Sequence, residues 1–142
     1  MNATLTSTHP AGPRARHVPL TTGLAAVAEA RTQVRGIVRA WQVPVDAYVA
    51  ALLTSELVTN AVRNEANPIV MLDVTCSTGR LRVDVHDTSR AMPAPADASA
   101  DAETGRGLII VGALADEWGF YATPGGKAVY FTLAFQPGGN GK

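Results

Sequence analysis

The segment of residues 68–87, PIVMLDVTCSTGRLRVDVHD, limits the possible folds more than any other part of the chain. It consists of two runs rich in β-branched residues on either side of the turn-forming sequence STG, a pattern typical of a β-hairpin. Residues 118–135, WGFYATPGGKAVYFTLAF, repeat the pattern around the sequence PGG. Since strands joined by tight turns run antiparallel, both segments predict an antiparallel or mixed sheet.

Two helical patterns precede the first hairpin. In the first, which starts at Leu24 and ends before Pro44, apolar residues recur on one helical face. Thr21 or Thr22 is available as its N-cap residue. The second pattern begins with Pro44 in its opening turn and continues to about Arg63.

A third, short apolar helix is predicted in residues 105–118, GRGLIIVGALADEW, with its glycines at the start. The elements therefore follow the order helix, helix, hairpin, loop, helix, hairpin. This order predicts an α+β two-layer sandwich, in which a mixed, mostly antiparallel sheet is covered on one face by helices.

Length and composition favour one domain. With 142 residues, of which 46% are hydrophobic, the chain is long enough for one core and short for two. Residues 1–17, rich in Thr, Ser, Pro and Ala, are predicted to be a flexible tail, and so are residues 137–142. Residues 18–136 are left as the domain.

Charge and cysteine content exclude several classes of function. Twelve basic and twelve acidic side chains cancel, so no overall field draws the protein to nucleic acid or to an anionic membrane. Cys76 is the single cysteine, which excludes an internal disulfide and a cysteine-based zinc cluster. We expect a cytoplasmic protein, because no apolar run is long enough to span a bilayer and the first residues lack a secretory apolar segment.

Three polar side chains occupy positions where the patterns call for apolar ones. Glu56 and Asn60 fall within the apolar stripe of the second helix. In the strand RLRVDVHD, every second residue from Leu81 to Val85 is apolar, and Asp87 is the next residue on that face. Because an unsatisfied buried polar group costs about 1–3 kcal/mol, each of the three needs a partner or borders a cavity. Hydrogen bonds to neighbouring backbone or water are the alternative explanation.

Two further features follow Asp87. Residues 88–104 form a long polar connection of the kind that covers a site as a lid. Next, the sequence GRGL, Gly105 to Leu108, places glycines at a predicted helix start, where free N–H groups and the helix dipole favour phosphate. Together with the three polar side chains, these features predict a nucleotide site. The sequence GGKA lacks the spacing of a P-loop, and the kinase sequences HRD and DFG are absent.

The sequences TSELVTNAV, VDVHDTS, TGRGLIIVGALADEWG and TPGGKAVYF together resemble the GHKL ATPase superfamily, whose members have the Bergerat ATP-binding fold. The likeness is strongest to the small bacterial anti-sigma-factor serine kinases and related histidine-kinase-like ATPase domains. It covers residues 20–135, with the motifs in the family's order.

The resemblance implies roles for the polar residues. Asn60 matches the N-box asparagine, a ligand of the Mg²⁺ ion that bridges the ATP phosphates. Glu56, one turn earlier, matches the general base that accepts the proton of an attacking hydroxyl. Asp87 matches the carboxylate that accepts a hydrogen bond from the adenine 6-amino group, which implies a preference for ATP over GTP. Further nucleotide contacts are implied for Ser89, Gly105, Arg106, Gly107 and Leu108.

The sequence departs from the family's pattern at three places. Thr88, Ser89 and the residues after them replace the glycines that usually follow the aspartate. Asn64 stands where relatives often have a histidine. In the last hairpin, Ala128 stands where many relatives have a threonine beside the adenine, so Asp87 is expected to carry more of the adenine recognition.

The leading hypothesis for function is an ATP-binding regulator of transcription that phosphorylates a Ser or Thr of a STAS-domain anti-anti-sigma partner. The alternative is a module without catalysis, which uses nucleotide to set its shape and sequesters a sigma factor or another regulator. A third interpretation is a scaffold of the same fold that has lost nucleotide binding. Histidine-kinase activity is disfavoured, because no helical segment with a phosphoacceptor histidine precedes the domain. The resemblance also leaves a homodimer open.

Overall fold

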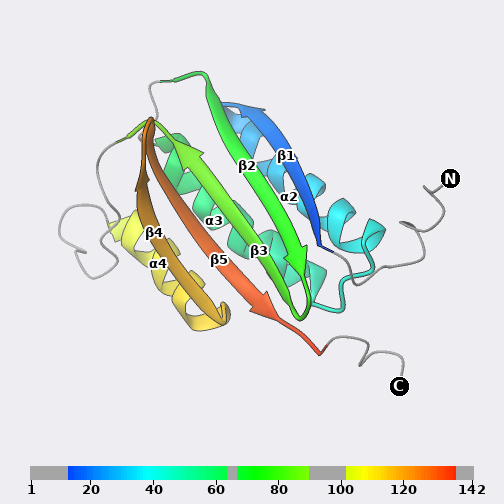
Figure 1. The fold of residues 1–142 in the computed structure, drawn as a ribbon. Coiled ribbons are helices and arrows are strands. Elements are labelled where there is room, and N and C mark those ends of the chain that lie inside the picture. Colours follow the sequence, from blue (N-terminus) through cyan, green and yellow to red (C-terminus); the bar gives the residue numbers. More distant parts are fainter. Residues whose placement is uncertain (1–12, 64–66, 90–101, 137–142) are drawn as a thin grey trace, which may run out of the picture.

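The structure is a computed structural model that describes residues 13–63, 67–89 and 102–136, with side chains from residue 107 onward in the last range. The described elements form two layers, a sheet and three helices packed on one face of it (Figure 1). Their order is β1 (Arg14–Thr21), α2 (Leu24–Ala40), α3 (Ala47–Arg63), β2 (Ile69–Ser77), β3 (Arg80–Asp87), α4 (Ala102–Leu114), β4 (Glu117–Thr123) and β5 (Gly126–Ala134). The predicted α+β two-layer sandwich is confirmed.

The sheet is antiparallel throughout. Its five strands lie in the order β1-β2-β3-β5-β4, and every neighbouring pair among them is antiparallel. Both predicted hairpins are confirmed: Thr78 and Gly79 join β2 to β3, and Pro124 and Gly125 join β4 to β5. Gly79 has a φ of 79°, a conformation that glycine adopts without strain.

The strand β1 corrects the predicted boundary of the N-terminal tail. Composition assigned residues 14–17 to the tail, yet they belong to a strand that pairs with β2 along its whole length. The physical reason is the alternation around Pro19, which directs Val18 and Leu20 into the core. Proline is compatible with this position because β1 is an edge strand, where one side of the backbone needs no partner. Residues 1–12 lie outside the described part of the chain.

Helix α2 begins without the threonine cap that the sequence predicts. Gly23 stands at the N-cap position with a φ of 143°, and no side chain caps the helix. Thr22 instead bonds to the chain entering β2, because its N–H and its hydroxyl both donate to the Pro68 carbonyl oxygen, at 2.8 and 3.3 Å. Thr21 is the last residue of β1. Neither threonine is therefore available to cap the helix, since Thr21 belongs to β1 and Thr22 is bonded to Pro68.

Helix α3 starts three residues after Pro44, which therefore lies outside its opening turn. Asp46 caps the helix, because its Oδ1 atom accepts hydrogen bonds from the N–H groups of Tyr48 at 2.9 Å and Val49 at 3.3 Å. The helix ends at Arg63, as predicted.

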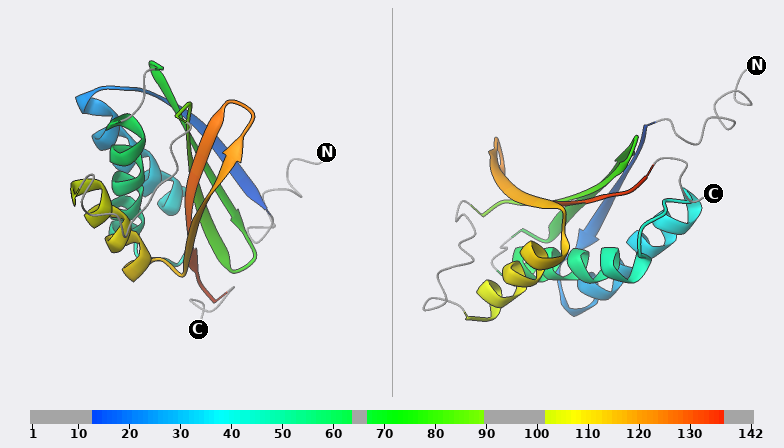
Figure 2. Two further views of the ribbon diagram at one scale, coloured as in Figure 1. Left: turned by 90° about the vertical axis from the view of Figure 1, so that its left-hand side faces the viewer. Right: turned by 90° about the horizontal axis from the view of Figure 1, so that it is seen from below.

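The core lies between the sheet and the helices, as the two turned views show (Figure 2). Helix α3 is central, because it packs against α2, α4 and strand β3. The largest fully buried side chains include Phe131, Leu20, Ile37, Leu53, Leu57, Leu72, Leu81 and Leu108. In the part of the chain that the structure describes, the helices are too short or too polar to cross a membrane.

The face of the sheet opposite the helices carries a polar network around Asp84. Arg82 donates through Nε and Nη2 to the two carboxylate oxygens of Asp84 at 2.8 and 2.9 Å, and the Tyr121 hydroxyl donates to the same carboxylate at 2.8 Å. The Arg82 guanidinium lies 3.9 Å from the centre of the Tyr130 ring. Burial, followed by the hydrogen bond to Asp84, raises the pKa of Tyr121. Tyr121 therefore stays protonated, and its hydrogen bond intact, at neutral pH.

Candidate functional site

The buried or half-buried polar residues of α3 fall into two groups. The Thr54 and Ser55 hydroxyls donate to carbonyl oxygens of the preceding turn at 2.8 and 2.7 Å, so the helix itself satisfies both. The side chains of Glu56 and Asn60 have no hydrogen-bond partner among the described residues, although Asn60 is only 7% exposed. The half-buried Thr59 hydroxyl has no hydrogen-bond partner there either, so the periodicity singled out two of three such residues on α3.

The carboxylate of Glu56 lies directly against Gly107 of α4. A Cβ atom placed on Gly107 would be 2.6 Å from Glu56 Oε1, so the flexible end of the Glu56 side chain would have to move. Gly107 is buried, and its missing side chain is what leaves room for the carboxylate between α3 and α4. The structure therefore brings together the predicted base and one of the predicted glycines.

The carboxylate of Asp87 is buried in an ion pair. Its side chain is 1% exposed and that of Lys127 is 3% exposed. Lys127 Nζ donates to Asp87 Oδ1 at 2.9 Å and to Oδ2 at 2.8 Å, and the Ser89 N–H donates to Oδ1 at 2.9 Å. Asp87 faces the helices, as the strand alternation predicted. Its contact with the predicted site residue Ser89 is through the backbone.

The register of β3 and β5 corrects the predicted neighbour of Asp87. Lys127 lies opposite Asp87, whereas Ala128 lies opposite His86. Because side chains alternate between the faces of a strand, Ala128 points to the other side of the sheet and cannot contact a ligand beside Asp87. Sequence reasoning missed Lys127. Counting by twos back from the buried Phe131 and Val129 would have placed it on the inner face.

Helix α4 starts earlier than the sequence predicts. It begins at Ala102, so Gly105 and Gly107 lie inside its first two turns and do not open it. Only the first four N–H groups of a helix lack an intrahelical partner, which places the free donors at and before Gly105. Ala102 and Glu103 favour helix, which explains the earlier start. The Leu108 side chain is buried in the core. The nucleotide contacts of residues 105–108 stay a prediction.

Two of the predicted residues and Lys127 lie on segments that meet at one end of the molecule. Figure 1 shows the C-terminal ends of α3 and β3 and the start of β5 at the same end of the sheet. These segments carry Asn60, Asp87 and Lys127. Residues 90–101, most of the predicted lid, lie outside the described residues.

The described residues include no group of three or more His, Cys, Asp or Glu side chains that could hold a metal ion. The Asn60 amide oxygen is a hard ligand without a hydrogen-bond partner among them, which suits Mg²⁺ if phosphates and water complete its shell. The Mg²⁺ site at Asn60 stays a prediction.

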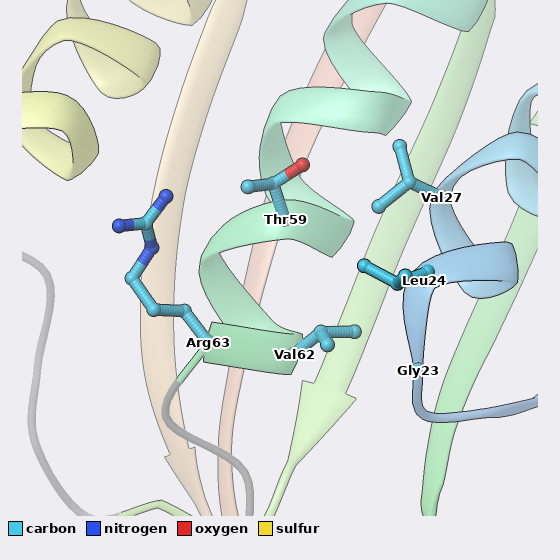
Figure 3. A pocket seen from close by; sticks show the side chains of 6 residues that line it. All are labelled: Gly23, Leu24, Val27, Thr59, Val62 and Arg63. Carbon is cyan, nitrogen blue, oxygen red and sulfur yellow. The ribbon is translucent and has the colours of Figure 1, made fainter.

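An apolar groove of about 420 Å³ lies elsewhere, between the start of α2 and the end of α3 (Figure 3). Leu24 and Val27 of α2 face Val62 of α3 across it, while the Arg63 side chain extends from the other side of α3. The lining includes none of Glu56, Asn60 and Asp87. This groove is therefore separate from the predicted site.

The chain folds as an antiparallel sheet with helices on one face, and its central helix carries polar side chains without hydrogen-bond partners among the described residues. The chain belongs to the histidine kinase-like ATPase domain family, whose model matches residues 20–133. Membership of this family implies nucleotide binding.

The same fold occurs in the crystal structure of the RsbU and RsbW domains of Rv1364c from Mycobacterium tuberculosis, which superposes with a TM-score of 0.62 at 19% sequence identity. The match covers 85% of this chain and 32% of that one, so this chain spans about a third of its length. At this identity the likeness concerns the fold alone. The comparison with curated proteins found no match.

Proposed function

We propose that the chain binds ATP with Mg²⁺ and acts as a serine/threonine protein kinase of the anti-sigma-factor type. The observation that carries the proposal lies on α3, where Glu56 and Asn60 stand one turn apart without hydrogen-bond partners among the described residues. Their polar atoms are not sealed in the core, so a bound ligand can reach both. Membership of the histidine kinase-like ATPase domain family supports ATP as that ligand.

Each polar residue has a separate task in this proposal. Asp87 accepts a hydrogen bond from the purine, and the Asn60 oxygen helps hold Mg²⁺, which neutralises phosphate charge when bound. Glu56 accepts the proton of the attacking hydroxyl. Its carboxylate is half-buried beside Gly107, so the side chain is positioned and yet able to meet a bound substrate. The Gly105 N–H group, which lies in the first turn of α4 and lacks an intrahelical partner, supplies a further nucleotide contact.

The proposed phosphoacceptor is a Ser or Thr of a STAS-domain anti-anti-sigma partner. Support comes from the likeness of the sequence to anti-sigma-factor serine kinases and from the fold shared with a chain that contains an RsbW domain. A module that sequesters a sigma factor without catalysis is the second candidate. It is favoured by the residues after Asp87, where Thr88 and Ser89 stand in place of glycines.

The kinase is tested by incubating the protein with labelled ATP, Mg²⁺ and a STAS-domain protein. The wild type is expected to label the partner, and Glu56→Gln is expected to slow labelling by about 10²–10⁴-fold, the usual contribution of a general base. Glu29→Gln is the matched control, because it makes the same change at an exposed position of the neighbouring helix α2. Labelling by Glu29→Gln should equal that of the wild type.

The outcomes separate the two candidate functions. Labelling that survives Glu56→Gln would remove Glu56 as the base. Magnesium-dependent ATP binding without transfer to any STAS-domain protein would favour the non-catalytic module. Absence of ATP binding by isothermal titration would remove both.

A further inference from the structure

The two edges of the sheet differ in how well they are protected against pairing with another strand. Among the described residues no strand lies beyond β4, so one side of its backbone presents N–H and C=O groups without a strand partner (Figure 1). At the other edge, β1 carries Pro19 and the charged residues Arg14 and Arg16, which hinder edge-to-edge pairing. β4 has no proline, and its only charged residue is Glu117 at its first position. The edge formed by β4 is therefore the one open to another strand.

Apolar side chains are exposed beside this open edge. Of the seven large hydrophobic side chains exposed in the described part of the chain, four belong to α4 and β4: Ile109, Leu114, Phe120 and Tyr121. Phe120 is 43% exposed, and its ring centre lies 6.2 Å from that of Trp118. Trp118 also lies against α4, because a Cβ atom on Gly112 would be 3.3 Å from its Nε1 atom. Ile109 precedes Gly112 by one turn on the same side of α4, so helix and strand expose apolar groups together.

The sequence of β4, EWGFYAT, is complementary to itself when two copies run antiparallel. A two-fold axis through Phe120 brings all seven residues into register, whereas an axis through any other residue leaves part of the strand unpaired. Phe120 then faces Phe120 of the second copy. Trp118 faces Ala122, a large side chain against a small one, and Glu117 faces Thr123, so no like charges oppose each other.

Gly119 faces Tyr121 in the same register. The ring of Tyr130 already lies over Gly119, where a Cβ atom would be 2.9 Å from the Tyr130 hydroxyl oxygen. Tyr121 and Tyr130 of one copy form a tilted pair with ring centres 6.3 Å apart. Tyr121 of the second copy would therefore meet an aromatic ring, and no side chain of the residue opposite would obstruct it.

We propose that β4 is a dimerisation edge, at which two copies of this chain pair antiparallel about Phe120. The dimer would have one continuous sheet of ten strands, five from each copy, with the protected strand β1 at both ends. The second copy supplies hydrogen-bond partners to the open edge and covers Phe120. The inference does not depend on the proposed nucleotide site, because β4 carries none of the residues assigned to that site.

The first test is sedimentation velocity of the full chain without nucleotide. We expect a dimer at about 100 μM protein. Phe120→Lys places two ammonium groups opposite each other at the two-fold axis, and it should raise the dimer dissociation constant by at least about tenfold. Tyr48→Lys is the matched control, since it replaces an aromatic residue that is 71% exposed on α3 and should leave the constant unchanged. A monomeric wild type, or a dimer that Phe120→Lys does not weaken, would overturn the inference.

The second test measures the register by disulfide cross-linking in Cys76→Ser protein, which removes the native thiol. Phe120→Cys should link to itself on mild oxidation, because position 120 faces its own copy. Glu117→Cys and Thr123→Cys should not link alone, since each lies about 20 Å from its counterpart, yet a mixture of the two should link. Tyr48→Cys measures linkage by chance collision.

Linkage at position 120 no faster than at position 48, or a mixture that does not link, would contradict the proposed register. The mixture keeps Phe120 in both copies, so its outcome decides the inference even where Phe120→Lys does not fold.

Discussion

The ion pair between Asp87 and Lys127 allows a quantitative test of the core. The structure gives the Asp87 carboxylate three hydrogen bonds, two of them from Lys127, and leaves it 1% exposed. In Lys127→Met the charge would stay buried with a single backbone donor. Removal of one partner from a buried ion pair typically costs about 3–5 kcal/mol, because the remaining charge is uncompensated. For a domain of this size, that loss lowers the melting temperature by about 10–20 °C.

The assay is urea unfolding followed by circular dichroism, with thermal melting as a second measurement. The double variant Asp87→Leu, Lys127→Met is the control, since it removes both charges and fills the same space with apolar atoms. It should recover most of the loss, apart from about 1 kcal/mol for the unmatched Ser89 N–H. A single variant within about 1 kcal/mol of the wild type, or a double variant as unstable as the single one, would refute the description of a tightly buried pair.

Three further predictions concern single positions. Gly126→Ala should destabilise the protein by at least about 1–3 kcal/mol in urea unfolding, because its Cβ would lie 2.1 Å from a backbone oxygen of β3, whereas Gly125→Ala meets nothing within 4 Å and should be close to neutral. Gly107→Ala should change stability by less than about 1 kcal/mol, since only the flexible end of Glu56 must move. Because that carboxylate is displaced, the variant should slow phosphoryl transfer to the partner protein. Transfer at the wild-type rate would contradict this prediction. Burial and a carboxylate hydrogen bond raise the pKa of Tyr121 in the folded state. The stability linked to its proton is therefore fully present below the ordinary tyrosine pKa of about 10. It is lost as the pH rises through the higher folded-state pKa. Tyrosinate absorbance, compared with Tyr121→Phe, should show a folded-state midpoint above that of the unfolded chain.

Most of the fold was predictable from local patterns. The period of apolar residues located α2 and α3, and the turn sequences located both hairpins. The same periods placed Glu56, Asn60 and Asp87 on inward faces; Asn60 and Asp87 are buried, and Glu56 is half-buried against Gly107. Periodicity succeeds for helix α2 because one of its faces is covered and the other is exposed.

What could not be predicted depends on contacts between distant segments. Thr22 is used by the chain entering β2 and not by its own helix, and Pro19 sits in a strand because that strand is at an edge. The partner of Asp87 depends on the register of β3 with β5, and an error of one residue substituted Ala128 for Lys127. The start of α4 was misplaced because the glycines were read as the beginning of the helix, and Ala102 precedes them.

The edge position of β1 has a practical consequence for shortened versions of the protein. A polypeptide that starts at residue 18, where the composition alone would trim it, keeps Val18 and Leu20 but loses the first half of the strand. The corresponding stretch of β2, from Asp73 to Cys76, would then present bare amide and carbonyl groups at the border of the sheet. An exposed edge of this kind can pair with the edge of another copy, so the trimmed polypeptide should self-associate more readily than one that begins before Arg14.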